Sequence, residues 1–159
     1  MQVKGAILNR GEDGYSYFKQ VFDKIEVLSI QYNWLISYPE CYPQDKALEK
    51  RMQNDYLWIP GREIKSLFQL EDFQWVWGVL SGFSSNILLE DVLKYPLPYA
   101  DGYSGFWKNP VTLQHPLAEI ELVAWDSSCT LCIAKKERII DEFWALYSQA
   151  EDLEEYNKK

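Results

Sequence analysis

The residues best suited to metal or redox chemistry are three cysteines and a single histidine. Cys129 and Cys132 form a C-x-x-C pair, and Cys41 and His115 would complete the Cys3His set of a structural zinc site. If residues 129–134 form a strand, however, Cys129 and Cys132 point to opposite faces and lie about 10 Å apart along it. We therefore expect buried, reduced thiols, no metal ion and no cofactor, with the zinc-stabilised domain as the alternative.

Two glycine-containing loops have partial likeness to catalytic or phosphate-binding loops. Gly11-Glu-Asp-Gly14 falls between an expected strand and an expected helix, but its two acids would repel a phosphate. Gly102-Tyr-Ser-Gly105 lacks the G-x-S-x-G spacing of a nucleophile elbow, and His115 would have to serve Ser104 as a base from across the same loop. We expect ordinary turns at both places, with His115 as a loop side chain, and we name no catalytic residue.

Aromatic and acidic side chains gather in the irregular stretch that ends at Pro116. Tyr and Trp bury large areas at low entropic cost and are enriched at the centres of protein interfaces. We expect the tyrosines of this stretch to be partly exposed, whereas Phe106 and Trp107 could fold back over the core. The predicted binding residues are Tyr95, Tyr99, Asp101, Tyr103 and Trp107.

Phe73, Trp75 and Trp77 alternate with other residues, a period-two pattern that predicts three rings on one face of a strand. Such a face could stack sugars. On a central strand it is more often covered by neighbouring elements, so we expect these rings to belong to the core.

The charge of the chain restricts its partners. Its 159 residues include 16 Lys and Arg against 24 Asp and Glu, which gives a net charge of −8. This charge repels phosphate backbones and anionic lipids, so we expect neither nucleic acid nor a membrane as a partner. An anionic surface attracts cations, and the expected partner is a basic protein. The sequence does not determine the oligomeric state.

The predicted location is the cytoplasm. No apolar run has the length of a signal peptide core or of a membrane span. An odd number of cysteines also fits reduced thiols better than a disulfide framework.

Hydrophobic periodicity predicts alternating strands and helices in the first half of the chain. The polar stretch 40–55 is ambiguous and contains a helical turn or a loop at 47–52. The expected elements are a strand at Val3–Leu8, a helix over Tyr17–Ile25 with Asp13 as its N-cap, strands at Ile30–Ser37 and Tyr56–Ile59, and a short helix at Ile64–Phe68.

The second half combines an irregular region with a clear hairpin. The strand around Trp75 is expected to break at Ser81–Asn86, and residues 99–116 to form a long surface excursion. The other expected elements are a short helix at Leu88–Leu93 capped by Asn86, a hairpin of Glu119–Trp125 and Cys129–Ala134 around Asp126–Ser128, and an amphipathic helix at Ile139–Ala150 whose acidic end, Glu151–Glu155, frays.

These elements predict one α+β domain over residues 1–159. Its sheet is mostly antiparallel or mixed, with N-terminal and C-terminal amphipathic helices packed on it. No repeat, linker or low-complexity tract divides the chain.

The hairpin and helix from Glu119 to Tyr147 resemble the C-terminal part of a family of small Bacillus-type bacterial proteins of unknown function, with a looser likeness in the N-terminal strand. The resemblance implies a bacterial protein and brings no activity or functional residue. Our hypothesis is a non-catalytic binding domain of the immunity or inhibitor kind, which recognises a partner through an acidic, aromatic surface. The alternative is a small-ligand-binding protein or a hydrolase that uses carboxylates and aromatics, such as Asp101 in the 99–116 loop.

Overall fold

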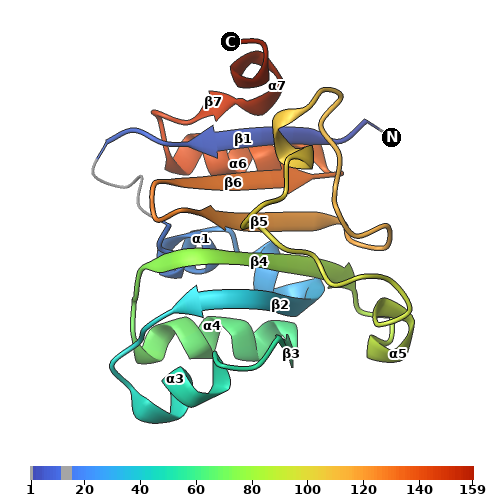
Figure 1. Cartoon of the computed structure of the whole chain (residues 1–159). Helices are drawn as coiled ribbons and strands as arrows, with labels where there is room; N and C mark the ends of the chain where they lie inside the picture. Colours follow the sequence, from blue (N-terminus) through green and yellow to red (C-terminus); the bar gives the residue numbers. More distant parts are fainter. Residues whose placement is uncertain (1, 12–15) are drawn as a thin grey trace.

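Seven strands form one antiparallel sheet in the computed structural model, which describes residues 2–11 and 16–159. Their order is β3-β2-β4-β5-β6-β1-β7 (Figure 1). The α+β class expected from the sequence is therefore confirmed. In chain order the strands are β1 (Lys4–Leu8), β2 (Tyr32–Cys41), β3 (Tyr56–Ile59), β4 (Trp75–Ser84), β5 (Ile120–Trp125), β6 (Cys129–Ala134) and β7 (Glu151–Asp152).

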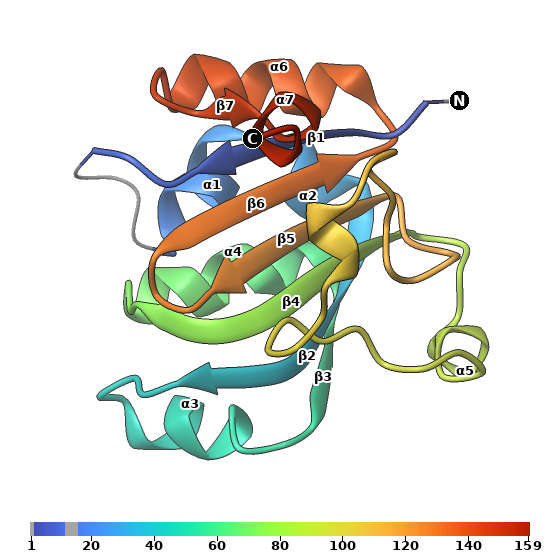
Figure 2. The same cartoon turned by 45° about the horizontal axis from the view of Figure 1, so that its top comes forward.

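Helices cover one face of the sheet, and a long connection crosses the other (Figures 1 and 2). The covering helices are α1 (Lys19–Lys24), α2 (Val27–Ile30), α4 (Gly61–Leu70) and α6 (Glu137–Leu146). The shorter elements α3 (Lys46–Arg51) and α7 (Leu153–Asn157) lie at the two edges. The connection between β4 and β5, residues 85–119, contains α5 (Leu89–Val92) and the 3-10 turn η1 (Gly105–Trp107).

Because side chains alternate along a strand, the sheet separates two cores. The helix-side core contains large rings such as Phe22 and Phe68, which stack with centroids 5.2 Å apart. The opposite core lies under the connection and includes Phe106 and Val123. Burial of each such side chain stabilises the fold by about 1.5–3 kcal/mol. Since both faces are covered, all six residues of β6 are buried.

The predicted C-terminal hairpin is confirmed. Trp125 of β5 pairs with Cys129 of β6, and the turn between them places Asp126 and Ser127 at positive φ, +50° and +56°. A short polar side chain such as that of Asp tolerates this left-handed conformation better than a bulky one. The two cysteines of the C-x-x-C pair point to opposite faces, as expected: Cys129 belongs to the connection-side core and Cys132 to the helix-side core.

An irregularity in β2 overturns two expectations. The strand does not end before Pro39 but continues to Cys41, because two register shifts against β4 absorb the proline, which has no N–H to donate. Within the irregularity Tyr38 adopts a φ of +46°. The same shifts reverse the side-chain alternation of β4, so that Trp75 belongs to the helix-side core and Trp77 to the opposite one. The prediction that the three rings share a face was wrong.

Strand β4 also runs through the segment that was expected to break it. Gly82 and Phe83 pair with β2 and remain in the sheet, because tertiary pairing overrides the local glycine and serine content. The short helix that follows is confirmed as α5, but its N-cap is Leu88 and not Asn86.

The predicted N-terminal helix is divided in two. Helix α1 ends at Lys24, with Ile25 as its C-cap, and α2 begins at Val27. Strand β2 therefore starts at Tyr32 and not at Ile30, whose side chain is exposed. The expected N-cap, Asp13, and most of the Gly11–Gly14 loop lie outside the described residues. The predictions for Tyr56–Ile59 and Ile64–Phe68 are confirmed by β3 and α4, and residues 46–51 form helix α3.

The acidic C-terminal segment does not fray from a long helix, which corrects that expectation. Helix α6 ends at Leu146, and Glu151 and Asp152 then pair with β1 as the edge strand β7. The Asp152 side chain caps α7 by accepting a hydrogen bond from the backbone N–H of Glu155 at 3.1 Å. Leu153 is fully buried, so tertiary packing and the cap together fold this segment.

No helix within residues 2–11 and 16–159 is both long enough and apolar enough to cross a membrane.

Candidate functional site

The connection between β4 and β5 is part of the core as well as of the surface, which corrects the expectation of a simple surface excursion. It crosses the sheet face opposite the helices, in front of β4 and β5 in Figure 1. Small and aromatic side chains hold it in place. Its buried residues include Val92, Ala100, Phe106, Val111, His115 and Ala118.

A buried carboxylate, Glu121 of β5, fastens this connection. Its two carboxylate oxygens accept hydrogen bonds from the backbone N–H groups of Gln114 at 2.7 Å and His115 at 3.0 Å. The Ser81 hydroxyl lies 3.5 Å away. Burial raises the pKa of Glu121 to about 7, although the hydrogen bonds that it accepts act in the opposite direction. Its oxygens are directed at backbone donors, which makes it a positioning residue for the connection.

His115 is a second anchor: it lies in the connection, as expected, and its side chain is buried. Its Nδ1 accepts from the backbone N–H of Leu117 at 3.1 Å, so Nε2 carries the proton and donates to the carbonyl of Val92 at 2.9 Å. Phe83 and Tyr95 contact the ring edge to face, at 4.9 and 5.2 Å between centroids. Burial lowers the pKa of His115, which favours this neutral form.

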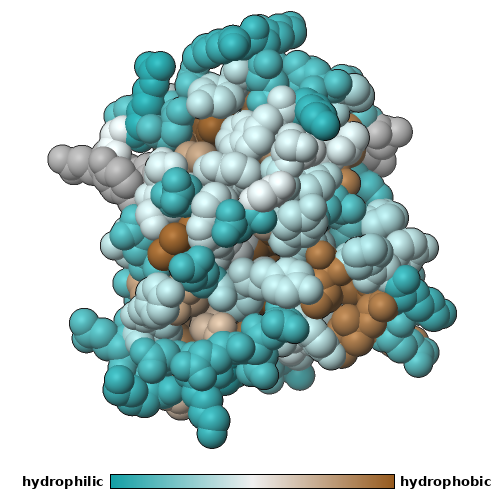
Figure 3. Space-filling model, in the orientation of Figure 1, coloured by the Kyte–Doolittle hydropathy of each residue, from teal (hydrophilic) through white to brown (hydrophobic). Residues whose placement is uncertain are grey.

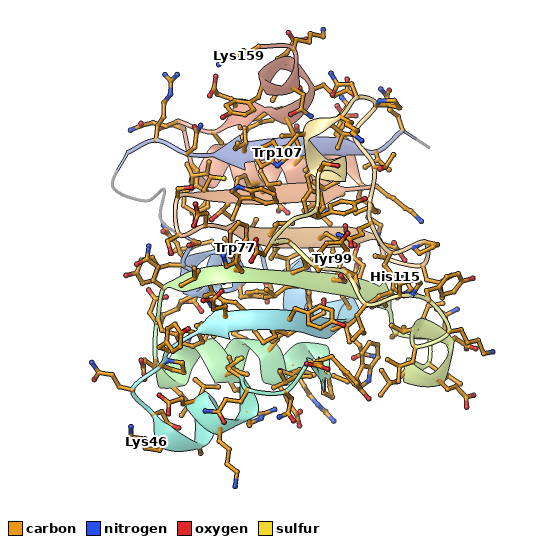
Figure 4. The ribbon with its side chains drawn as sticks, in the orientation of Figure 1. Lys46, Trp77, Tyr99, Trp107, His115 and Lys159 are labelled. Atoms are coloured by element: carbon orange, nitrogen blue, oxygen red, sulfur yellow. The ribbon has the colours of Figure 1, made fainter. Side chains whose placement is uncertain are left out.

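Beside these anchors lies a depression that we call the acidic groove. Its volume is about 680 Å³, and Tyr38, Glu40, Trp77, Leu97, Tyr99 and Asp101 line it. Tyr38 and Tyr99 are 46% and 42% exposed, so both rings remain open to a ligand. Figure 4 shows Trp77 on β4 beside the connection that carries Tyr99.

Both carboxylates of the acidic groove are exposed. Glu40 accepts a hydrogen bond from the Tyr42 hydroxyl at 3.3 Å, and the negative charge of Glu40, more than this hydrogen bond, raises the pKa of Tyr42. In the part of the chain that the structure describes, neither Glu40 nor Asp101 forms an ion pair with a lysine or arginine. The groove therefore holds two carboxylates whose charge is not compensated locally.

A continuous aromatic row, formed by Trp77, Trp125, Trp107 and Tyr156, leads away from the groove. Successive ring centroids are 5.0, 4.9 and 6.0 Å apart, and the Trp pairs meet edge to face. The four residues come from β4, β5, η1 and α7 and are only partly buried. At its far end lies a second depression of about 550 Å³, which we call the neutral pocket; Asn9, Trp107, Trp125, Ser128, Tyr156 and Asn157 line it.

The space-filling view shows this same side of the molecule. In Figure 3 it is hydrophilic or intermediate over most of its area, and strongly hydrophobic colour is confined to separate patches. Tyr and Trp have intermediate hydropathy, so the aromatic row does not stand out there. The exposed aliphatic residues Leu88 and Leu93 flank α5 and line neither depression.

The structure brings most of the predicted binding residues together. Tyr99 and Asp101 line the acidic groove, and Trp107 belongs to the aromatic row. Tyr103 connects the two regions, because its ring packs against Tyr99 at 5.3 Å and Phe106 at 4.7 Å. Tyr95 lies apart, against His115, and lines neither depression.

Several residues of this surface were not foreseen from the sequence. Trp77 was expected in the core, and Tyr38 and Glu40 were expected after the end of their strand. Trp125 and Tyr156 were assigned no role on the surface. Pro39, which follows directly on a run of strand-forming residues, was the available signal for a strand irregularity.

The thiols are enclosed in the two cores. All three cysteines are free and buried, and burial raises the pKa of Cys41 and of Cys129 to about 12 and raises that of Cys132 further. Within the described ranges no three or more His, Cys, Asp or Glu side chains are placed to hold a metal ion. Protonated, enclosed thiols of this kind are poor nucleophiles and poor ligands.

Rings and uncompensated carboxylates on one face are typical of a recognition surface. Searches of protein-family models, of curated proteins and of solved structures return no match to this chain. The resemblance of the C-terminal hairpin and helix to a Bacillus-type family therefore stays a prediction.

Proposed function

We propose that the protein is a non-catalytic binding domain of the immunity or inhibitor kind, and that a cationic side chain of a basic partner protein occupies the acidic groove. The observation that carries this proposal is the combination of Glu40 and Asp101 with the exposed rings of Tyr38 and Tyr99 in one depression. Carboxylates attract a cation, and aromatic faces stabilise it through their quadrupole.

Arginine fits this environment better than lysine. Its guanidinium group is planar, so it can stack on a ring while its N–H groups bond a carboxylate, and it is less strongly hydrated than an ammonium group. One such contact contributes only about 0.5–2 kcal/mol. The remaining affinity would come from the aromatic row, whose tryptophans and tyrosine are the residue types enriched at binding hot spots. The net charge of −8 would accelerate encounter with a basic partner.

The groove can be tested with a matched pair of small probes. N-acetylarginine amide carries the guanidinium, and N-acetylcitrulline amide has nearly the same shape without the charge. We expect the arginine probe, and not the citrulline probe, to shift the indole N–H resonance of Trp77 in a titration followed by NMR. We expect higher salt to weaken the effect, because the carboxylates of the groove are exposed.

Two double variants separate the effect of the groove carboxylates from the effect of the net charge of the protein. Glu40→Gln with Asp101→Asn removes both groove carboxylates, whereas Glu63→Gln with Asp141→Asn removes the same charge from exposed positions on α4 and α6, which cover the opposite face. We expect the first variant to bind the arginine probe roughly fivefold more weakly and the second to bind it normally. Equal binding by both variants, or equal response to the two probes, would contradict the proposal.

The partner itself can be sought with the same proteins. We expect affinity purification from the native cell to retain a basic protein on the wild type and on the Glu63/Asp141 control, and to lose it with the Glu40/Asp101 variant. A partner that all three proteins retain equally would place recognition on another surface.

A further inference from the structure

The neutral pocket has a different chemical character from the acidic groove. It shares no lining residue with the groove, and its main walls are the rings of Trp107, Trp125 and Tyr156. The polar groups between the rings are the amides of Asn9 and Asn157 and the hydroxyl of Ser128. None of the described residues that line this pocket has an ionised side chain at neutral pH, in a chain whose net charge is −8.

The polar groups of the pocket retain hydrogen-bonding capacity. Both N–H bonds of the Asn157 amide are used, toward the carbonyl of Phe106 at 3.1 Å and the side-chain oxygen of Asn109 at 3.3 Å. The Asn157 carbonyl oxygen has no donor among the residues that the structure describes. The Ser128 hydroxyl donates to the carbonyl of Trp125 at 3.1 Å and also interacts with the Cys129 side chain. The amide oxygen of Asn9 is buried with no partner in the described chain, a costly condition that is rare in native proteins.

The tryptophans add donors to these acceptors. Among the described residues, no acceptor is hydrogen-bonded to the indole N–H group of Trp107 or of Trp125. Both side chains are partly exposed. The side chains that line the pocket therefore carry donors, acceptors and aromatic faces. A ligand with hydroxyl groups matches this set, because each hydroxyl both donates and accepts.

Other ligand classes fit less well. The lining itself holds no cation for a phosphate or carboxylate and no carboxylate for a cation. Lys159 lies over the Tyr156 ring, with Nζ 5.2 Å from the centroid, but its ammonium is paired with Glu151 at 2.9 Å. A purely apolar ligand would cover the amides without bonding them, which costs about 1–3 kcal/mol for each group left unsatisfied. Cys129 also borders the pocket, but its raised pKa keeps the thiol neutral, so it supplies no thiolate for a metal or an electrophile.

From these observations we infer that the neutral pocket is a binding site for an uncharged saccharide. A pyranose ring would place its C–H face on an indole ring and its hydroxyls toward the Asn157 and Ser128 side chains. The volume of about 550 Å³ lies within the usual range of small-molecule sites. This inference does not depend on a cationic partner in the acidic groove. Because the rings of Trp107, Trp125 and Tyr156 belong both to this pocket and to the aromatic row, a saccharide and a partner protein that contacts the row would compete for them.

Titration of the labelled protein with neutral glycosides tests the inference. The probes are the methyl glycosides of glucose, galactose, mannose and N-acetylglucosamine and a tetrasaccharide of glucose and of N-acetylglucosamine, with adenosine as a ring ligand of another class. We expect at least one saccharide to produce saturable shifts of the Trp107 and Trp125 indole N–H resonances. The resonance of Trp58, which packs against Phe83 in a separate cluster, should not move.

Variants distinguish the pocket from nonspecific contact. We expect Trp107→Leu to weaken saccharide binding roughly tenfold, because it removes an aromatic face, and Asn157→Asp to weaken it roughly two- to tenfold through the introduced charge. Trp58→Leu is the matched control and should bind normally. Thermal unfolding checks that each variant is folded. If a variant does not fold, the titration of the wild-type protein still tests the inference.

The inference would be overturned if no saccharide gave a saturable shift, if adenosine bound more tightly than every saccharide, or if Trp58→Leu reduced binding as much as Trp107→Leu.

Discussion

Glu121→Gln is the variant that most directly tests the buried anchor of the β4–β5 connection. In the folded protein the pKa of Glu121 is about 7, whereas the ordinary value of 4.5 applies to the unfolded chain. Between these values the folded state holds a proton that the unfolded state has already released. The contribution of this group to stability is therefore fully present below pH 4.5 and is lost as the pH rises to about 7. The difference of about 2.5 pH units corresponds to roughly 3 kcal/mol.

Glutamine is neutral at every pH, so Glu121→Gln cannot show this pH-dependent loss of stability. The variant carries a cost of about 1 kcal/mol that does not depend on pH, because its amide NH2 replaces one oxygen that accepts from the backbone of Gln114 or His115. Relative to the wild type, the variant should therefore gain roughly 3 kcal/mol between acid and pH 8, and it should be the more stable protein at pH 8.

Urea unfolding followed by tryptophan fluorescence at pH 4.5, 5, 6, 7 and 8 measures this difference. Glu119→Gln is the control, since Glu119 lies two residues earlier, immediately before β5, and is partly exposed. Its free energy of unfolding should follow the wild-type profile. Parallel pH profiles for the wild type and Glu121→Gln would refute the argument that burial controls the protonation of Glu121.

Three further predictions follow from the described contacts. Phe68→Ala should reduce the free energy of unfolding by about 3–5 kcal/mol in urea titrations, because Phe68 is buried and stacks on Phe22; a loss below 1 kcal/mol would contradict the packing. Below about pH 6.5 the unfolded chain binds a proton at His115, whereas burial keeps the folded side chain neutral, so the free energy of unfolding decreases as the pH falls through this value. In the same assay, the free energy of unfolding of His115→Asn should decrease less than that of the wild type over this interval. The thiols of Cys129 and Cys132 should resist alkylation at pH 8 until urea unfolds the protein, and rapid labelling of the native protein, read by mass spectrometry, would show that they are not enclosed.

Local patterns predicted the regular elements well. The hairpin around residues 126–128 was recognisable because its strands are rich in β-branched and apolar residues and its turn contains residues that tolerate positive φ. The opposite orientation of Cys129 and Cys132 followed from the period of two in a strand. Element ends were less predictable, as at Ile30 and Leu146, because they depend on packing against other parts of the chain.

The candidate surface could be predicted only in part. Tyr99, Asp101 and Trp107 were chosen for residue type within an irregular segment, and they do line the groove or the row. Trp77 was misplaced because its side of the sheet depends on register shifts against β2, and no local pattern encodes a register between strands far apart in sequence.

The amino-acid sequence by itself determined the α+β class, the hairpin and the negative charge, because each depends on neighbouring residues or on composition. Tertiary structure alone decided that Glu40, Trp77 and Asp101 meet in one groove, and that Trp107, Trp125 and Tyr156 enclose one pocket. These residues come from separate strands, helices and a long connection. Their proximity follows from strand order and register, which the whole chain specifies through burial on both faces of one sheet.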